Sequence, residues 1–336
     1  MPAAWVFPLL AVLLRLSLGL NNAPVSVVER RLAAMGTVLD LSVSGPNRMT
    51  ALEASEAAVG EITRVEELLT TWRPGSPLDR LNAASRGETV VLGGELASLL
   101  AEVLAWSERT ERAFDPTVLP LVRAWGLRRG GRVPAGAELA RALAATGLEQ
   151  FRVDTTTSGA RRLSPDAGID EGAWGKGYAL DRAVDALRRA GVPEALLDLG
   201  GQVSTIGRET VAIADPRDRA RTAAFLSTAD ESVSTSGNSE RSLLVGGRRI
   251  GHLLDPRTGC PAPDFGSATA VAPSGLVADI LSTAFFVLGP EEGLDLSEKL
   301  RRRGHPNEVL FLVVSDRGRK AVTSPGLRSR LKEERP

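Results

Sequence analysis

Six short β-strand candidates crowd into residues 195–272, and they constrain the fold of this chain more than any other feature. They are short runs bounded by turn-forming residues, as is typical of strands. The six candidates are residues 195–199, 210–214, 223–227, 232–235, 242–245 and 268–272. Helical patterns lie on both sides of this region. The sequence therefore predicts a mixed α and β fold.

Apolar residues at helical spacing predict the helices. Amphipathic helices are expected over residues 51–70, 94–112, 176–189 and 290–303, and a helix that is apolar on all sides over residues 276–288. Because its whole surface is apolar, this last helix is expected to be buried. Further strands are expected over residues 37–43 and 309–315, loops over 72–76 and 130–136, and a hairpin over 155–162.

No tandem repeat or long linker divides the 336-residue chain. A chain of this length can bury a large core as one domain or as two smaller ones. We expect one compact domain over residues 25–325, with two lobes meeting near residues 195–205. The segment from Arg317 onward is polar and is expected to fray, leaving residues 326–336 as a tail.

Composition narrows the function. Lys and Arg total 41, as do Asp and Glu, so the net charge is zero, which argues against a nucleic-acid partner held by bulk electrostatics. The single cysteine, Cys260, excludes an intrachain disulfide and a multi-thiolate metal site. With only two histidines, a zinc or iron centre is not expected. Any metal would be a hard cation bound by oxygen ligands.

Residues 5–20 are almost wholly apolar, and a polar stretch follows from Asn21. The length matches the apolar part of a signal peptide better than a membrane-spanning helix. However, no basic residue precedes the run, and Arg15 interrupts it. We expect residues 1–22 to be an export leader, with an uncleaved anchor or a buried start as alternatives. The expected location is the periplasm or the outer face of the inner membrane.

Residues 252–259 read His-Leu-Leu-Asp-Pro-Arg-Thr-Gly and predict a rigid turn. Pro256 fixes φ, and Gly259 permits a positive φ. Such a turn can hold an imidazole, a carboxylate and a guanidinium within reach of one ligand. The alternative is a capped turn that only joins two strands.

Asp279 and Thr283 lie four residues apart within the apolar helix, so they share one face. Burying an unpaired carboxylate is costly, so this pair requires an explanation. Two hard oxygen ligands could provide part of a magnesium site, which water, carbonyl or phosphate oxygens would complete. In the alternative, Asp279 pairs locally and Thr283 bonds back to a helix carbonyl.

Residues 170–178 place three glycines and Lys176 directly before or within the first turn of a helix. Small residues allow a ligand close to the backbone, and helix N-terminal amides attract phosphate. The spacing matches no standard nucleotide motif, so a tight strand-to-helix turn is the alternative. A second polar turn, residues 234–238, either holds phosphate or ends a strand.

Two further segments carry candidate ligand contacts. Phe114 is expected in the core, whereas Asp115 either caps the next element or bonds a ligand. Trp72 and Trp174 each lie in a glycine-containing loop, where an aromatic ring could stack on a ligand.

Taken together, these segments resemble the ApbE-type flavin transferases, which transfer FMN from FAD to protein. The resemblance rests on seven ordered motifs and covers nearly the whole chain after the leader. The motifs are residues 35–37, 113–117, 170–178, 199–201 with 214–217, 234–241, 252–259 and 278–283. It implies a two-lobed α/β fold related to tunnelling folds, with FAD in the cleft between lobes.

The resemblance also implies site residues. FAD contacts would come from Met35, Trp72, Ala113, Phe114, Asp115, Asp170, Lys176, Leu254 and Arg257. Magnesium would be bound by Asp279, Thr283 and the backbone carbonyl of Ala173, with Ser282 nearby. This chain departs from the pattern at Glu171, where an apolar or small residue is usual, and in lacking a lipid-attachment cysteine.

The implied reaction needs a Ser or Thr hydroxyl of an acceptor protein to attack the FMN-side phosphorus of FAD, so that AMP leaves. Such a hydroxyl is a weak nucleophile and requires a base. We assign phosphate neutralisation to Lys176 or Arg257, and proton acceptance to His252 or Asp255. The expected acceptor belongs to an exported or membrane redox complex. The alternatives are hydrolysis of FAD to FMN and AMP, and a non-catalytic FAD-binding subunit.

Overall fold

The computed structural model describes residues 25–239, 242–245, 247–316 and 318–333. The expected leader, residues 1–22, lies outside these ranges. Within them, no helix is long and apolar enough to cross a membrane.

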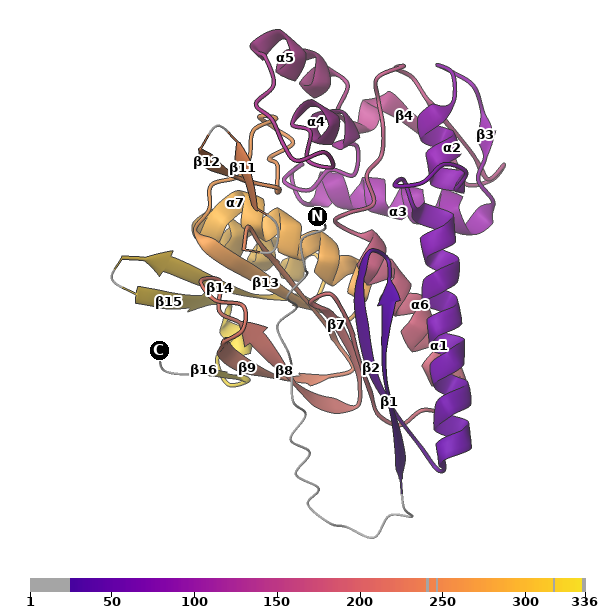
Figure 1. The fold of residues 1–336 in the computed structure, drawn as a ribbon, viewed down its shortest axis with the longest axis vertical. Helices are drawn as coiled ribbons and strands as arrows, with labels where there is room; N and C mark the ends of the chain where they lie inside the picture. The colour runs from indigo at the N-terminus through magenta and orange to yellow at the C-terminus, as the bar shows by residue number, and fades with distance from the viewer. Residues whose placement is uncertain (1–24, 240–241, 246, 317, 334–336) are drawn as a thin grey trace, which may run out of the picture.

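The largest sheet in the described ranges has eight strands, and their order in the sheet follows their order in the chain (Figure 1). Every neighbouring pair in it is antiparallel. Its strands are β1 (Ser26–Ala34), β2 (Thr37–Gly45), β6 (Ala195–Leu199), β7 (Gln202–Ile206), β10 (Ser232–Gly237), β13 (Gly266–Ala272), β14 (Glu308–Ser315) and β15 (Gly318–Thr323). The β1–β2 connection is a two-residue turn in which Met35 and Gly36 have φ of 49° and 72°, as a tight hairpin requires.

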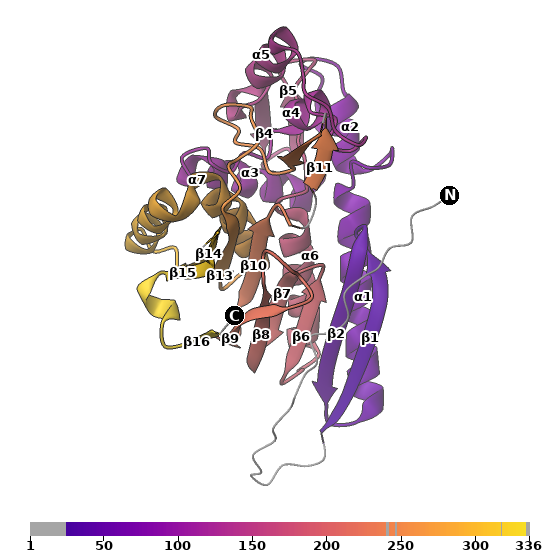
Figure 2. The ribbon, with the colours of Figure 1, turned by 60° about the vertical axis from the view of Figure 1, so that its left-hand side comes forward.

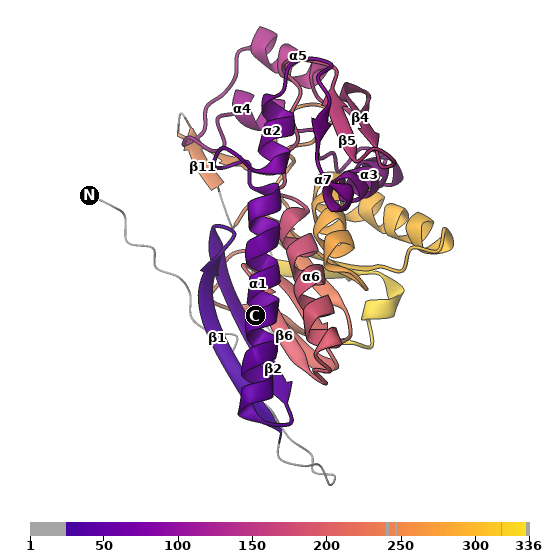
Figure 3. The same cartoon turned by 90° about the vertical axis from the view of Figure 1, so that its right-hand side faces the viewer.

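Three helices cover one face of this sheet (Figure 3): α1 (Arg48–Leu69), α6 (Gly175–Arg189) and α7 (Gly275–Arg302). The Asn47 side chain caps α1 by accepting a hydrogen bond from the Thr50 N–H at 2.9 Å. The two helices predicted over residues 276–288 and 290–303 are the two halves of α7. Gly289, with a φ of 76°, and Pro290 kink the helix between them.

A second, three-stranded sheet covers the opposite face of the large sheet. It consists of β8 (Arg208–Ala214), β9 (Thr222–Ala229) and β16 (Leu331–Glu333), in the order β16-β9-β8. Its apolar residues join Val233, Val271 and Leu310 of the large sheet in one buried cluster. The prediction of a frayed end after Arg317 is wrong. Strand β15 extends the large sheet, and β16 pairs with β9. Leu327, in η2 (Pro325–Leu327), is fully buried.

The remaining elements gather beyond one end of the large sheet (Figure 2). They are α2 (Pro77–Ala83), β3 (Val90–Val91), α3 (Gly94–Arg109), α4 (Leu119–Ala124), α5 (Gly136–Ala144), η1 (Leu148–Gln150), β4 (Phe151–Asp154), β5 (Gly159–Arg162), β11 (Ser242–Val245) and β12 (Arg248–Gly251). The hairpin predicted over residues 155–162 is the β4–β5 turn with strand β5. Ile250 of β12 packs against the apolar cluster of α4 and α5.

The predicted mixture of α and β is confirmed, and all six strand candidates between residues 195 and 272 are strands. A boundary between lobes near residues 195–205 is wrong, because β6 and β7 are paired neighbours inside the large sheet. One buried apolar cluster runs from this sheet through α1, α6 and α7 into α3 and β4–β5.

Candidate functional site

The helices α6 and α7 cross in direct backbone contact, and this crossing fixes the candidate site. An added Cβ on Gly177 would lie 2.1 Å from the Gly275 carbonyl oxygen. The same contact seen from α7 places a Cβ on Gly275 2.4 Å from the Gly177 carbonyl oxygen. Only glycine fits at both positions, since real Cβ atoms do not approach a carbonyl oxygen this closely.

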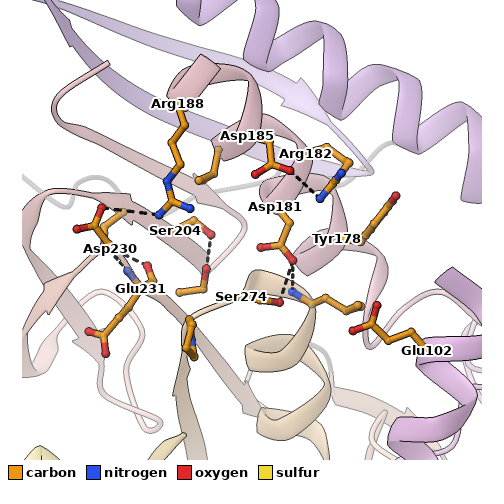
Figure 4. Close-up of a pocket in the computed structure, with 15 residues that line it drawn as sticks. Glu102, Tyr178, Asp181, Arg182, Asp185, Arg188, Ser204, Asp230, Glu231 and Ser274 are labelled. Carbon is orange, nitrogen blue, oxygen red and sulfur yellow. Dashed lines mark hydrogen bonds and ion pairs between the residues drawn. The ribbon is translucent and has the colours of Figure 1, made fainter. Parts of the chain in front are cut away.

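Asp181 of α6 caps the start of α7 (Figure 4). Its carboxylate accepts hydrogen bonds from the Gly275 N–H at 2.6 Å, the Leu276 N–H at 2.9 Å and the Ser274 hydroxyl at 3.0 Å. Burial raises the pKa of Asp181, against the effect of these three bonds. The cap and the glycine contact together hold α7 in one register against α6.

This register places Asp279 of α7 beside the first turn of α6. The Gly177 N–H donates to Asp279 Oδ2 at 3.0 Å, and Lys176 Nζ lies 3.7 Å from Oδ1. Asp279 is only 4% exposed. The structure therefore pairs this carboxylate with the neighbouring helix α6.

A row of hydroxyl groups lies between α7 and β10, next to Asp279. Ser282 Oγ donates to Ser234 Oγ at 3.0 Å and lies 2.9 Å from Ser236 Oγ. Thr283 Oγ1 lies 3.4 Å from the same Ser236 hydroxyl. Thus Ser282 and Thr283 contact strand β10, to which Ser234 and Ser236 belong, and the polar turn predicted over residues 234–238 is strand as far as Gly237.

The donor set of this site suits a hard cation. Asp279, Ser282 and Thr283 offer oxygen atoms, and the half-buried Ala173 lies in the turn that leads into α6. The described part of the chain contains no cluster of three or more His, Cys, Asp or Glu side chains that could hold a metal ion. With one carboxylate, the site fits Mg²⁺, which commonly takes one or two carboxylates and completes its shell with water and substrate phosphates.

The turn before α6 connects this site to Asp170. Lys176 Nζ lies 3.5 Å from the Gly172 carbonyl oxygen, and the Gly172 N–H donates to Asp170 Oδ1 at 2.8 Å. Trp174, considered for ligand stacking, is instead fully buried, and its indole N–H donates to the Asp170 carbonyl at 2.8 Å. The stacking hypothesis for Trp174 is therefore wrong, because the core encloses its ring.

Trp72 differs, since 61% of it is exposed. The Arg128 guanidinium lies over its ring, 4.4 Å from the centroid, and also donates to Asp170 Oδ2 at 2.5 Å. Glu171, the departure from the family pattern, is buried and accepts hydrogen bonds from the Thr71 N–H at 3.0 Å and the Thr71 hydroxyl at 2.5 Å. Burial and the neighbouring Asp170 carboxylate raise the pKa of Glu171.

The segment 113–117 joins the Asp170 turn through the backbone, because the Asp170 N–H donates to the Pro116 carbonyl at 2.8 Å. Ala113 and Phe114 are buried, as expected for Phe114. Asp115 is buried and accepts bonds from the N–H and hydroxyl of Thr117, at 2.8 and 2.5 Å. Burial raises the pKa of Asp115.

Met35 lies in the β1–β2 turn, where its N–H donates to Glu66 Oε2 of α1 at 2.9 Å. Its side chain is half-buried and packs against the main apolar cluster.

The turn at residues 252–259 adopts the predicted geometry, with a φ of 74° at Gly259. Arg257 Nε and Nη2 donate to the two carboxylate oxygens of Asp255 at 2.9 and 3.0 Å. This bidentate pair raises the pKa of Arg257. Leu254 is buried and pairs with Pro261 across the turn. His252 is half-buried.

The end of β10 connects this turn to the hydroxyl row. A Cβ on Gly251, directly before His252, would lie 2.4 Å from Asn238 Oδ1, and Asn238 follows β10. Contacts through Asp170, Lys176, Ser236 and Asn238 therefore join most of the segments that carry the predicted site residues, whereas Met35 contacts α1.

Sequence reasoning missed Arg128, Asp181 and the Gly177–Gly275 contact. Arg128 is one of several arginines in a glycine-rich loop, and no spacing distinguishes it. A separate hollow of about 270 Å³ lies beside α6, and Figure 4 shows its lining. None of the predicted site residues line it, and Arg182 and Arg188 there face Asp185 and Asp230 at 2.7 and 3.7 Å.

The fold and site together define an α/β protein in which a buried carboxylate, Asp279, lies beside Lys176 and several hydroxyl groups. This set of groups suits a cation bound to phosphate. Residues 35–305 match the ApbE family, and the chain belongs to that family. It is 35% identical over 235 residues to a FAD:protein FMN transferase of Klebsiella pneumoniae (strain 342), which covers 69% of this chain and 74% of that protein. A second FAD:protein FMN transferase of the same organism is 31% identical over 316 residues, covering 90% of this chain and 88% of the relative.

The fold is likewise similar to that of the ApbE protein from Thermotoga maritima, with a TM-score of 0.82. The two sequences are 28% identical, and the match covers 92% of this chain and 100% of the other. The expected mixed α/β, ApbE-like fold is thereby confirmed at the level of overall architecture.

Proposed function

We propose that this chain catalyses the magnesium-dependent transfer of FMN from FAD to a Ser or Thr hydroxyl of an acceptor protein, with release of AMP. Family membership and the names of its relatives support the reaction class. The observation that carries the proposal is the buried Asp279 carboxylate between Lys176 and the Gly177 N–H, with hydroxyl groups beside it. Lys176 and the Gly177 N–H offset the cost of burying this carboxylate, and its oxygens are of the kind that Mg²⁺ prefers.

In the proposed step, the acceptor oxygen forms a bond to the FMN-side phosphorus. The bond from that phosphorus to the bridging oxygen breaks, and AMP leaves with the electron pair. The hydroxyl proton passes to a base. FMN remains on the protein as a phosphoester.

The residues of this chain would divide the work as follows. Asp279, Thr283, Ser282 and the Ala173 carbonyl would hold Mg²⁺, which would neutralise charge on the pyrophosphate oxygens. Lys176 would add a positive charge at the same phosphates. For the proton, we favour His252 over Asp255, because Arg257 engages both carboxylate oxygens of Asp255.

FAD would contact several segments, of which those carrying Trp72, Asp115 and Lys176 are joined at the Asp170 turn. The proposed contacts are Met35, Trp72, Ala113, Phe114, Asp115, Asp170, Lys176, Leu254 and Arg257. Trp72 supplies an exposed ring, and Arg257 is an exposed cation on the turn.

Replacing Asp279 tests the metal assignment. Asp279→Ala should lower flavinylation of an acceptor at least about 100-fold, because the site loses its only carboxylate ligand. Asp295→Asn removes an exposed carboxylate from the same helix and should leave the rate unchanged. The assay is protein-bound flavin fluorescence on a denaturing gel across a magnesium titration. Retention of magnesium-dependent transfer by Asp279→Ala would refute the assignment.

The same incubation without acceptor separates the alternatives. AMP and free FMN in equal amounts would identify a hydrolase, and persistent FAD without AMP would identify a binding subunit. If the chain transfers FMN, the amount of AMP released should equal the amount of acceptor modified.

We further propose that the enzyme acts outside the cytoplasm, in the periplasm or at the outer face of the inner membrane, on an acceptor of an exported or membrane redox complex. The apolar run at residues 5–20 supports this location. Cell fractionation of the full chain tests it: recovery in the cytoplasm alone would contradict the proposal.

A further inference from the structure

Three segments far apart in sequence meet at the side chain of Arg128, in the loop between α4 and α5. Arg128 donates to the Thr71 carbonyl at 2.9 Å, to the Thr71 hydroxyl at 2.7 Å and to Asp170 Oδ2 at 2.5 Å. It also lies 3.7 Å from Glu171 Oε2. One guanidinium therefore ties the segment after α1 to the turn before α6.

The same guanidinium lies over the Trp72 ring at 4.4 Å. A guanidinium stacked on an indole is stabilised by the cation–π interaction. An exposed tryptophan without such a contact would sample several rotamers, and ordering it on binding would cost free energy. Because hydrogen bonds fix Arg128, it holds the Trp72 ring in one orientation, with 61% of the residue still exposed.

Glu171 reinforces this arrangement from the other side. It is 7% exposed, and its two oxygens accept the N–H and the hydroxyl of Thr71, the residue directly before Trp72. A small or apolar residue at this position could not make these bonds. The departure at Glu171 thus has a structural role in this chain: it fixes the backbone that carries Trp72.

We propose that Arg128 is a positioning residue that preorganises Trp72 to bind a planar ring system of FAD. The inference rests on the proposed function, since it takes FAD as the ligand. Arg128 acts through Trp72. Its guanidinium stacks on the indole and donates hydrogen bonds to Thr71 and Asp170. The part of the indole that Arg128 does not cover is exposed and can contact the ligand. The planar, multiply donating guanidinium suits this role, whereas a lysine ammonium cannot stack and bond in the same way.

The test is a titration of the full chain with FAD, followed by flavin fluorescence. Arg128→Lys keeps the positive charge and should raise the Kd for FAD about tenfold, with kcat at saturating FAD changed less than about twofold. Arg129→Lys makes the same change at the exposed neighbouring residue and should bind FAD as the unchanged protein does. FMN and AMP titrations then identify which ring system loses affinity.

A double-mutant cycle separates positioning from general stability. In a Trp72→Leu background, Arg128→Lys should alter the Kd less than about twofold, because its target ring is gone. A purely structural role would lower thermal stability without this coupling. Unchanged FAD affinity in Arg128→Lys, or an equal effect in both backgrounds, overturns the inference while leaving the proposed function intact. Failure of the unchanged protein to bind FAD would overturn both.

Discussion

The contact between α6 and α7 makes a quantitative prediction for Gly177→Ala. The new Cβ would lie 2.1 Å from the Gly275 carbonyl oxygen and 2.8 Å from Asp279 Cβ. A comfortable carbon–oxygen contact is about 3.3 Å, so the helices would have to separate by about 1 Å. Such overpacking costs about 1–3 kcal/mol, whereas the better helix propensity of alanine returns at most about 1 kcal/mol.

We therefore expect Gly177→Ala to lower the free energy of unfolding by about 1–2 kcal/mol. Gly60→Ala is the matched control, because Gly60 is an exposed residue inside α1 and an added Cβ there would meet no atom within 4 Å. Only the propensity gain remains at Gly60, so that variant should be stabilised by up to about 1 kcal/mol. Urea unfolding of the three proteins measures both effects.

The same variant should also change the chemistry of the site. Moving the Gly177 N–H away from Asp279 Oδ2 would disturb the carboxylate proposed to bind magnesium, so the magnesium concentration for half-maximal activity should rise. If Gly177→Ala unfolds at the same urea concentration as Gly60→Ala, the close helix contact does not exist in solution, and the reasoning about the register of α7 fails.

Three further predictions test other parts of the fold. Burial raises the pKa of Asp115 above its ordinary 3.8, so its stabilising effect is complete below that value and is lost as pH rises through the folded-state pKa. Relative to Asp115→Asn, the unchanged protein should therefore lose stability to urea as pH rises above about 4, and a constant difference between the two proteins would contradict this. Gly259→Ala should lower the free energy of unfolding by about 2 kcal/mol, because φ at this position is 74° and two leucine methyl groups lie 3.1 Å from the new Cβ. Gly304→Ala is the control and should lower it by about 1 kcal/mol, because φ is 83° there but the space is open. Ending the chain after Ser324 removes the fully buried Leu327 and strand β16, so the free energy of unfolding should fall by at least about 2 kcal/mol in thermal unfolding. If the tail were frayed, this truncation would not change the free energy of unfolding.

The regular elements were predictable where the local pattern matches the environment. Helices α1 and α6 alternate buried and exposed residues at helical spacing, and β10 and β13 lie near the predicted positions. Strand β16 has three residues and no periodicity, so only its pairing with β9 defines it. Such an element depends on long-range contacts that no local pattern encodes.

The candidate site was predictable as a set of residues but not as an arrangement. The spacing of Asp279 and Thr283 placed both on one helix face. In the structure, Asp279 lies beside Lys176, and Thr283 lies beside Ser236. By contrast, Trp72 and Trp174 carry the same local signal, an aromatic residue in a glycine-containing loop. One is exposed and the other is enclosed, because only the tertiary fold determines which loop faces the core.

The strand order of the large sheet has a consequence for how the protein is made. Each of the seven strands after β1 pairs with the strand of this sheet that comes before it in the chain, so the sheet can grow at one edge as the polypeptide emerges from the ribosome or a translocation channel. No strand has to insert between two that are already paired. The carboxylate and hydroxyl groups of α7 arrive late, after β13, so the catalytic centre would assemble on a sheet that is already mostly in place.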